Sequence, residues 1–202
     1  MNLHILGVST HYGRAELVTV GVRARRPALI DRRQVPLIAA DLPGAPYHHE
    51  ALEMERAAAE ALVHRVRASV SEHALTALRE AHARGALAAV VIEESPYAAL
   101  PASLSEVLDS WALTCAADGM MVREAVADSA AALGLRVERH PRKADLVALA
   151  ATALGTTPGR VTDLLRAFGR QAGPPWRKEH QRAAAAALLV LGRLQPEGLA
   201  LD

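Results

Sequence analysis

Two carboxylates stand at the end of the most apolar short stretch of the sequence. Residues 88–95 read AAVVIEES, so a run of alanine, valine and isoleucine leads directly into Glu93 and Glu94. This pattern is typical of a strand that is buried on both faces and ends at the edge of a sheet. Ligands of α/β proteins bind outside the carboxyl ends of such strands, so we expect both carboxylates to face a crevice.

A second group of polar residues opens the last predicted helix, which reads WRKEHQRAAAAALLVLGRL over residues 176–194. Glu179, His180 and Arg182 lie in its first turns and can face the same crevice. The alternative is that they only solvate and cap the start of the helix, where the helix dipole favours glutamate. The run of alanines that follows allows the helix to approach the sheet closely.

The elements that would position these groups alternate between strands and helices. An alternating pattern in the second strand puts Glu16, Val18 and Val20 on one face and Ala15 and Leu17 on the other. The expected strands are 2–9, 14–22, 27–38 with a turn or bulge at 31–34, 88–95 and 135–140; the expected helical stretches are 49–84, 103–133 with a joint at Asp118–Gly119, 145–154, 158–168 and 176–194.

This order predicts an α/β fold with a mixed five-stranded sheet, opened by a three-strand meander and flanked by helices. We expect a single domain over residues 1–202, with a helical hairpin inserted at about 142–170. Ala151, Gly155 and Val161 in that hairpin are spaced as in a helix-turn-helix. Ala and Gly are abundant in this sequence and the hairpin has no arginine-rich face, so a hairpin used only for packing is the preferred interpretation.

Composition limits the class of protein. The formal charge is +1, far from the strongly basic balance of many nucleic-acid binders, and the hydrophobic fraction is 51%. No run of apolar residues is long enough for a membrane span and no leader opens the sequence, so we expect a cytoplasmic protein with no membrane contact. The single cysteine, Cys115, lies in an apolar helical run and is expected to be buried.

Three of these stretches resemble a known family. Residues 5–14, ILGVSTHYGR, are similar to the first strand and glycine-containing turn of RuvC-type Holliday junction resolvases, and residues 89–95 are similar to their fourth strand, which ends in a glutamate. The alanine-rich last helix is similar to their final helix. The resemblance implies an RNase H-like fold and a homodimer. The actin-like ATPases open with a comparable strand and hairpin, but a phosphate loop would need more glycine than Gly13 provides.

The resemblance also implies a metal site. Family members hold two Mg²⁺ ions with carboxylates from the first strand, the fourth strand and the last helix, and hard cations need such oxygen ligands. Glu93 matches the fourth-strand position, whereas Ser9 stands at the first-strand aspartate. On the last helix, either Glu179 and Arg182 or His180 and Ala183 take the two family positions, and neither choice keeps the aspartate.

The departures favour a RuvC-like protein that binds branched or duplex DNA and has partly lost its catalytic carboxylates. One alternative is an active Mg²⁺- or Mn²⁺-dependent endonuclease with a reworked site, and another is a non-enzymatic homodimeric scaffold built on the alanine-rich helices. The candidate catalytic residues are Glu93, Glu179 and His180; the candidate metal ligands are Glu93, Glu94, Glu179 and His180, with help from Asp31, Asp41 or Asp118; the candidate DNA-binding residues are Arg139, Arg142, Lys143, Arg177, Lys178 and Arg182.

These assignments make a geometric prediction. Ser9, Glu93 and the turn Glu179–Arg182 must converge at one edge of the sheet, within about 10–12 Å, the diameter of a helix. A site that has lost its metals would need no cofactor.

Overall fold

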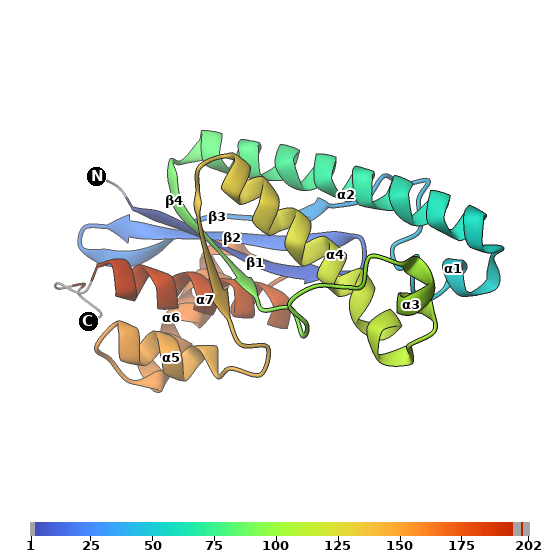
Figure 1. Ribbon diagram of the computed structural model, residues 1–202. Coiled ribbons are helices and arrows are strands. Elements are labelled where there is room, and N and C mark those ends of the chain that lie inside the picture. Colours follow the sequence, from blue (N-terminus) through green and yellow to red (C-terminus); the bar gives the residue numbers. More distant parts are fainter. Residues whose placement is uncertain (1–2, 196–198, 200–202) are drawn as a thin grey trace.

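A computed structural model describes residues 3–195 and residue 199. A mixed five-stranded sheet runs through its middle in the order β3-β2-β1-β4-β5 (Figure 1). The strands are β1 (His4–His11), β2 (Arg14–Arg23), β3 (Arg26–Pro36), β4 (Leu87–Glu93) and β5 (Arg136–His140). The meander β1–β2–β3 is antiparallel, while β4 and β5 run parallel to β1. The expected α/β class and opening meander are confirmed.

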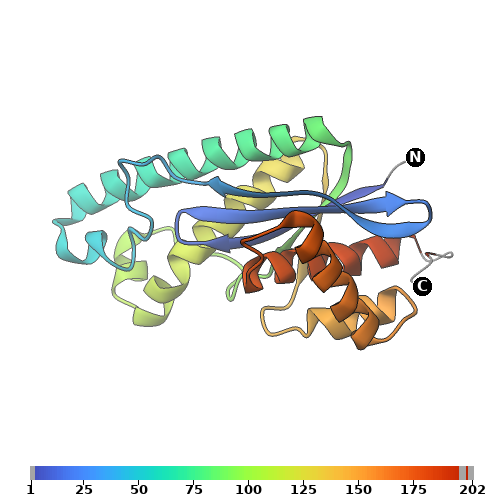
Figure 2. The same ribbon diagram turned by 180° about the vertical axis from the view of Figure 1, so that it is seen from behind.

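Helices cover both faces of the sheet (Figures 1 and 2). The helices are α1 (Glu50–Glu53), α2 (Arg56–Arg84), α3 (Leu104–Leu108), α4 (Trp111–Ala132), α5 (Leu146–Ala153), α6 (Pro158–Ala172) and α7 (Lys178–Leu194). The long helices α2 and α4 lie on one face, whereas α5, α6 and α7 lie on the other. Each face therefore has its own hydrophobic core.

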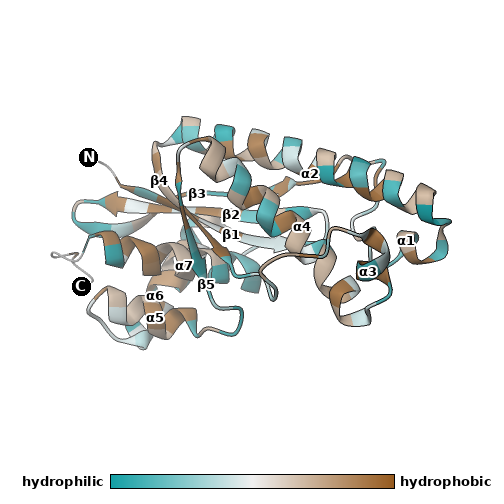
Figure 3. Ribbon diagram, in the orientation of Figure 1, coloured by the Kyte–Doolittle hydropathy of each residue, from teal (hydrophilic) through white to brown (hydrophobic). Residues whose placement is uncertain are grey.

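The side-chain alternation of the strands divides the two cores. On β2, Ala15 and Leu17 pack in the core beneath α2 and α4, and Val18 and Val20 pack in the core beneath α5, α6 and α7. The predicted alternation of this strand is confirmed. Hydrophobic residues dominate the body of α7, whereas hydrophilic and hydrophobic residues alternate along α2 (Figure 3). The body of α7 is thus an interior element.

Small residues bring α7 very close to the centre of the sheet. A Cβ atom built on Gly7 of β1 would lie only 1.8 Å from the carbonyl oxygen of Ala183. The alanines Ala183–Ala187 are at most 2% exposed and fill the interface with the sheet. The alanine run therefore seats the helix on the sheet, as expected, and leaves no alanine-rich surface there for a second subunit.

Several predicted boundaries shift in the structure. The first strand continues to His11, two residues beyond its predicted end, and Asn2, its predicted start, lies outside the described residues. The fourth strand ends at Glu93 rather than at Ser95. The irregularity in β3 falls at Ile30, where the pairing with β2 shifts by one residue, instead of at 31–34. Local sequence marks these irregularities only approximately, because cross-strand pairing decides them.

The predicted joint at Asp118–Gly119 is wrong. The break comes earlier, at Asp109 and Ser110, where the Thr114 hydroxyl donates to the carbonyl of Val107 (2.9 Å). Helix α4 runs unbroken through Gly119. A Cβ atom at Gly119 would lie 3.1 Å from the guanidinium nitrogens of Arg123, so this glycine makes room for a neighbouring side chain and does not bend the helix.

Helices α5 and α6 form the predicted hairpin. The Asp145 side chain accepts a hydrogen bond from the Ala148 amide at the start of α5, and Thr157 accepts one from the Arg160 amide at the start of α6. Gly155, at φ +65°, turns the chain between them. Helix α5 packs along α7 and α6 reaches β3, so the pair closes the second core. None of the described helices combines the length and the apolarity needed to cross a membrane.

The contact of Gly7 with Ala183 predicts a steep cost for any side chain at this position. Gly7→Ala should lower the free energy of unfolding by about 3 kcal/mol, because backbone atoms on both sides must move apart. Gly159→Ala in α6 is the matched control, since its Cβ would meet only the Thr157 hydroxyl at 3.8 Å. The control should stay within about 1 kcal/mol of the parent. Urea denaturation followed by circular dichroism measures both values, and equal effects would contradict the packing argument.

Candidate functional site

The start of α7 and the end of β4 meet through an ion pair. Arg182 Nη2 lies 3.0 Å from Glu93 Oε2. The same nitrogen donates to the backbone carbonyl of Arg142 at 3.2 Å, which ties the segment after β5 to the pair. Because Arg182 reaches Glu93 and Ala183 packs against Gly7, the helix presents Arg182 to the end of β4.

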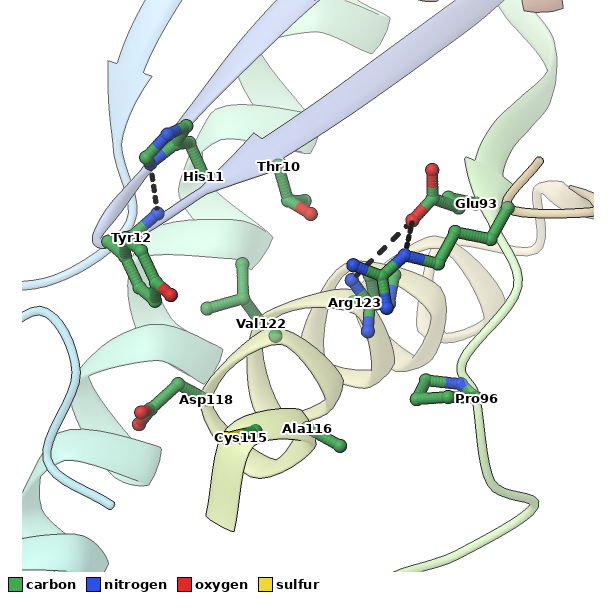
Figure 4. A pocket seen from close by; sticks show the side chains of 12 residues that line it. Thr10, His11, Tyr12, Glu93, Pro96, Cys115, Ala116, Asp118, Val122 and Arg123 are labelled. Carbon is green, nitrogen blue, oxygen red and sulfur yellow. Dashed lines mark hydrogen bonds and ion pairs between the residues drawn. The ribbon is translucent and has the colours of Figure 1, made fainter. Parts of the chain in front are cut away.

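Two further guanidinium groups surround the same carboxylate. Arg142 Nε lies 3.8 Å and Arg123 Nη1 lies 4.0 Å from Glu93 Oε1 (Figure 4). Arg142 is largely exposed, whereas Arg123 is 9% exposed and projects from α4 beneath Glu93. Burial lowers the pKa of Arg123, an effect that the charge of Glu93 opposes. Three cations share one carboxylate here, so positive charge is in excess.

A neighbouring pair extends this ion-pair network. Arg139 donates to both carboxylate oxygens of Glu124, at 3.2 and 2.7 Å, and the Ser95 hydroxyl donates to Glu124 Oε1 at 2.7 Å. Burial raises the pKa of Glu124, but the hydrogen bonds from Arg139 and Ser95 outweigh it and the net pKa is lowered. Arg123 Nε also donates to the Ser95 hydroxyl, at 3.4 Å. Glu124 is therefore a fixed anion beside the cationic cluster.

A buried pair lies at the other side of the α7 start. His180 Nε2 is 3.0 Å from Glu16 Oε2, and the two side chains are 2% and 7% exposed. The Arg177 amide donates to His180 Nδ1 at 3.1 Å, so the ring proton sits on Nε2 and faces the carboxylate. Burial lowers the pKa of His180, opposed by the charge of Glu16, and Trp176 stacks on the ring at 5.7 Å.

The remaining predicted site residues are spread around these two pairs. Ser9 of β1 is the cross-strand partner of Glu16 and so lies beside the buried pair. Glu179 is partly exposed at the start of α7, and Glu94 is exposed, with its amide donating to the carbonyl of His140. The structure thus brings Glu93 and Arg182 into direct contact and places Ser9 and His180 around Glu16.

A cavity of about 260 Å³ opens between the ends of β1 and β4 and the face of α4. Its wall includes Thr10, Glu93, Cys115, Asp118, Arg123 and Arg142. Cys115 is exposed, so the expectation of a buried thiol is wrong: the apolar run around it is helical, and this face of the helix borders the cavity.

Asp118 joins the cavity to the loop before α1. Its two carboxylate oxygens accept hydrogen bonds from the amides of Tyr47 and His48, both at 3.1 Å. Burial raises the pKa of Asp118 to about 6, against the opposing effect of these two hydrogen bonds. Of the other acids proposed as helpers, Asp31 pairs with Arg33 on β3 and Asp41 is exposed in a loop.

The donor set does not fit a pair of divalent cations. Mg²⁺ and Mn²⁺ need several oxygen ligands, preferably charged. By the resemblance, Ser9 takes the first-strand position, and neither Arg182 nor Ala183 supplies the aspartate of the last helix. The Arg182 guanidinium lies against the Glu93 carboxylate. Among residues 3–195 and 199, no group of three or more histidine, cysteine, aspartate or glutamate side chains could hold a metal ion.

The predicted DNA-binding residues fall into two groups. Arg142 and Arg182 belong to the cluster around Glu93, and Arg139 is held by Glu124. The others are exposed after β5 or at the start of α7; they are Lys143, Arg177 and Lys178. Both groups flank the cavity or the α7 start, so cations gather at the carboxyl edge of the sheet.

Sequence reasoning missed two residues of the site. Arg123 lies in the middle of a helix with no motif around it, and its only local signal is the glycine four residues earlier, which makes room for the guanidinium. Glu16 was placed on the correct face of β2, but the sequence contained no sign that His180, far along the chain, would face it.

The structure is similar to two solved structures of RuvC from Thermus thermophilus. The structure titled "Thermus thermophilus RuvC structure" aligns over 96% of this chain and 97% of its own, with 14% sequence identity and a TM-score of 0.58. The complex of T. thermophilus RuvC with a Holliday junction substrate aligns over 96% of both chains, with 15% identity and a TM-score of 0.55. The chain therefore has a RuvC-like RNase H fold, as its resemblance to the resolvases predicted. No protein-family model matches the sequence, and no curated protein does.

The neutral His180 predicts a pH-dependent stability. The pKa of His180 is lowered in the folded state. When the pH is lowered through the unfolded value near 6.5, the unfolded chain therefore takes up more protons than the folded chain, and the free energy of unfolding decreases. His180→Gln keeps a donor toward Glu16 but cannot titrate, so its loss of stability between pH 7.5 and 5.5 should be smaller than the parent's. Urea unfolding at both pH values measures the difference. Parallel losses in the two proteins would show that His180 does not titrate differently in the folded state.

Proposed function

We propose that this protein binds DNA, duplex or branched, through its RuvC-like domain and does not hydrolyse it by a two-metal mechanism. One observation carries the proposal: Arg182 of α7 lies 3.0 Å from Glu93, the one family carboxylate that is retained on the strands. A guanidinium at this place repels a divalent cation and attracts a phosphate. The site is thus suited to hold a phosphodiester and unsuited to cleave it.

The choice of DNA as the partner rests on two supports. The RuvC of T. thermophilus, which shares this fold, is described in complex with a Holliday junction substrate. In this chain the exposed cations Arg142, Lys143, Arg177 and Lys178 lie after β5 and at the start of α7, around the same edge of the sheet. Phosphate neutralisation by such side chains supplies most non-specific affinity for DNA. We place this activity in the cytoplasm.

The proposed activity predicts salt-dependent binding without metal-dependent cleavage. Gel shifts with a four-way junction and a linear duplex of the same length should show an association constant whose logarithm falls linearly with the logarithm of the salt concentration. The same DNA should remain intact with Mg²⁺ or Mn²⁺. Cleavage that requires the metal and disappears in Glu93→Gln would instead establish an endonuclease with a reworked site.

One variant separates the proposed contact from the general charge of the protein. Arg142→Gln should weaken DNA binding about tenfold, the worth of one charge-assisted hydrogen bond, and should make the salt dependence shallower by about one phosphate contact. Arg166→Gln is the control, because Arg166 is equally exposed (67% against 68%) but lies on α6. If both variants weaken binding to the same degree, the contact is not specific to this edge.

A second candidate function is a homodimeric interaction module, favoured by an exposed apolar patch. Trp111 is 67% exposed and its ring lies 5.1 Å from that of His48. Leu52 and Met54, in and just after the neighbouring α1, are 44% and 43% exposed. Clustered large apolar side chains at a surface are characteristic of protein interfaces. We propose that the protein forms a homodimer through this patch.

The patch makes the dimer testable. Sedimentation equilibrium of the parent should give a dimer, and Trp111→Ser should convert it to a monomer, because a central tryptophan commonly carries much of an interface's energy. Tyr97→Ser removes another exposed aromatic residue, 40% exposed, and should leave the dimer intact. A monomeric parent at high micromolar concentration would rule out the dimer, and a dimeric Trp111→Ser would rule out this interface.

A further inference from the structure

The cavity beside β1 and β4 is lined by a buried cation. The Arg123 side chain, on α4, is 11% exposed, and its guanidinium fits against Gly119 on the same helix. Its contacts with Glu93 at 4.0 Å and with the Ser95 hydroxyl at 3.4 Å are both long. Strong charge-assisted hydrogen bonds are about 2.7–2.9 Å long, so Arg123 keeps donor capacity toward the cavity.

The other two guanidinium groups around Glu93 also have hydrogen-bond donors that Glu93 does not satisfy. Arg142 is 3.8 Å from the carboxylate and 68% exposed, and only Arg182 makes a short contact with it, at 3.0 Å. Glu93 itself is 24% exposed, at the mouth of the cavity. One carboxylate offers two oxygens to three planar donors, each with several N–H groups. Glu93 therefore pairs with all three arginines and saturates none of them.

The size of the cavity fits a larger anion. Its volume of about 260 Å³ corresponds to roughly eight or nine waters at about 30 Å³ each. That is enough for a phosphate group with part of its sugar. A phosphate offers more acceptor oxygens than a carboxylate, and guanidinium groups bind it in a bidentate manner.

We infer that this cavity is a phosphate site in which Glu93 is the internal occupant. In the absence of nucleic acid, Glu93 holds Arg123, Arg142 and Arg182 together; a phosphate of the DNA backbone displaces its carboxylate toward solvent and takes over the three arginines. This inference rests on the proposed function, since it names the group that the site takes. It gives Glu93 the role of a competitor that lowers the affinity for DNA.

The role of Glu93 reverses the usual expectation for its replacement. Glu93→Gln should strengthen duplex binding about tenfold and steepen the salt dependence by about one contact. Glu72→Gln removes the same charge from an exposed position on α2 and should leave affinity within about twofold of the parent. Equal gains in DNA affinity in both variants would mean that net charge alone causes the effect, which would overturn the inference. A DNA affinity of Glu93→Gln that is unchanged or weaker than that of the parent would overturn it as well.

Cys115 gives a direct readout of the cavity. It is the single cysteine of the chain, it is exposed, and it lines the cavity wall. Inorganic phosphate should slow its alkylation by iodoacetamide several-fold relative to chloride at equal ionic strength, and more strongly in Glu93→Gln. Arg142→Gln, at a largely exposed position, should weaken this protection without loss of stability. Protection that is absent in the parent and in Glu93→Gln overturns the phosphate site.

The two assays also separate this inference from the proposed function. If phosphate protects Cys115 but neither the junction nor the duplex binds, the cavity is an anion site and the protein is not a DNA binder. If the parent binds DNA, but Glu93→Gln and Glu72→Gln bind it equally well and phosphate does not protect Cys115, the proposed DNA binding stands. The inference that a phosphate displaces the Glu93 carboxylate is then wrong.

Discussion

The contact between Gly7 of β1 and Ala183 of α7 determines the geometry of the whole carboxyl edge of the sheet. Because no side chain stands between the two backbones, the helix is seated directly on the central strand. The first turns of α7 then lie at a fixed height over the strand ends, with His180 facing Glu16 and Arg182 facing Glu93. Close backbone packing thus places two residues of α7 that are less than one turn apart, His180 and Arg182, in two separate ion pairs.

The same framework can serve opposite chemistries, because the fold fixes positions and the side chains decide the charge. Carboxylates delivered to one edge by strands and a helix would concentrate negative charge and attract cations. In this chain one carboxylate remains among three guanidinium groups, so the edge attracts anions instead. In the function we propose, the loss of hydrolysis and the affinity for phosphate would both result from this one exchange of charge, because fold alone does not assign the activity.

Sequence patterns predicted the features that depend on neighbouring residues along the chain. They failed for features that depend on contacts between residues far apart in the sequence or on the surface that a helix borders. The alternation of β2 and the apolar run before Glu93 reflect burial of local side chains, so the strands and the order of elements were correct. The predicted helix joint at Gly119 was wrong because this glycine leaves space for Arg123. The predicted burial of Cys115 was wrong because an apolar helix can border a cavity. The roles predicted for Glu179 and His180 remain predictions.

Asp118 has a structural consequence of its own. With one carboxylate it secures the backbone of Tyr47 and His48, and it stands on the turn of α4 that lines the cavity. His48 in turn lies against the exposed Trp111. The cavity and the apolar patch are thus braced by a single buried side chain, and any displacement of that turn is felt at both surfaces. If the cavity takes a ligand and the patch takes a second subunit, as we propose, a displacement of this turn by either one would change the affinity for the other, and the effect would be reciprocal.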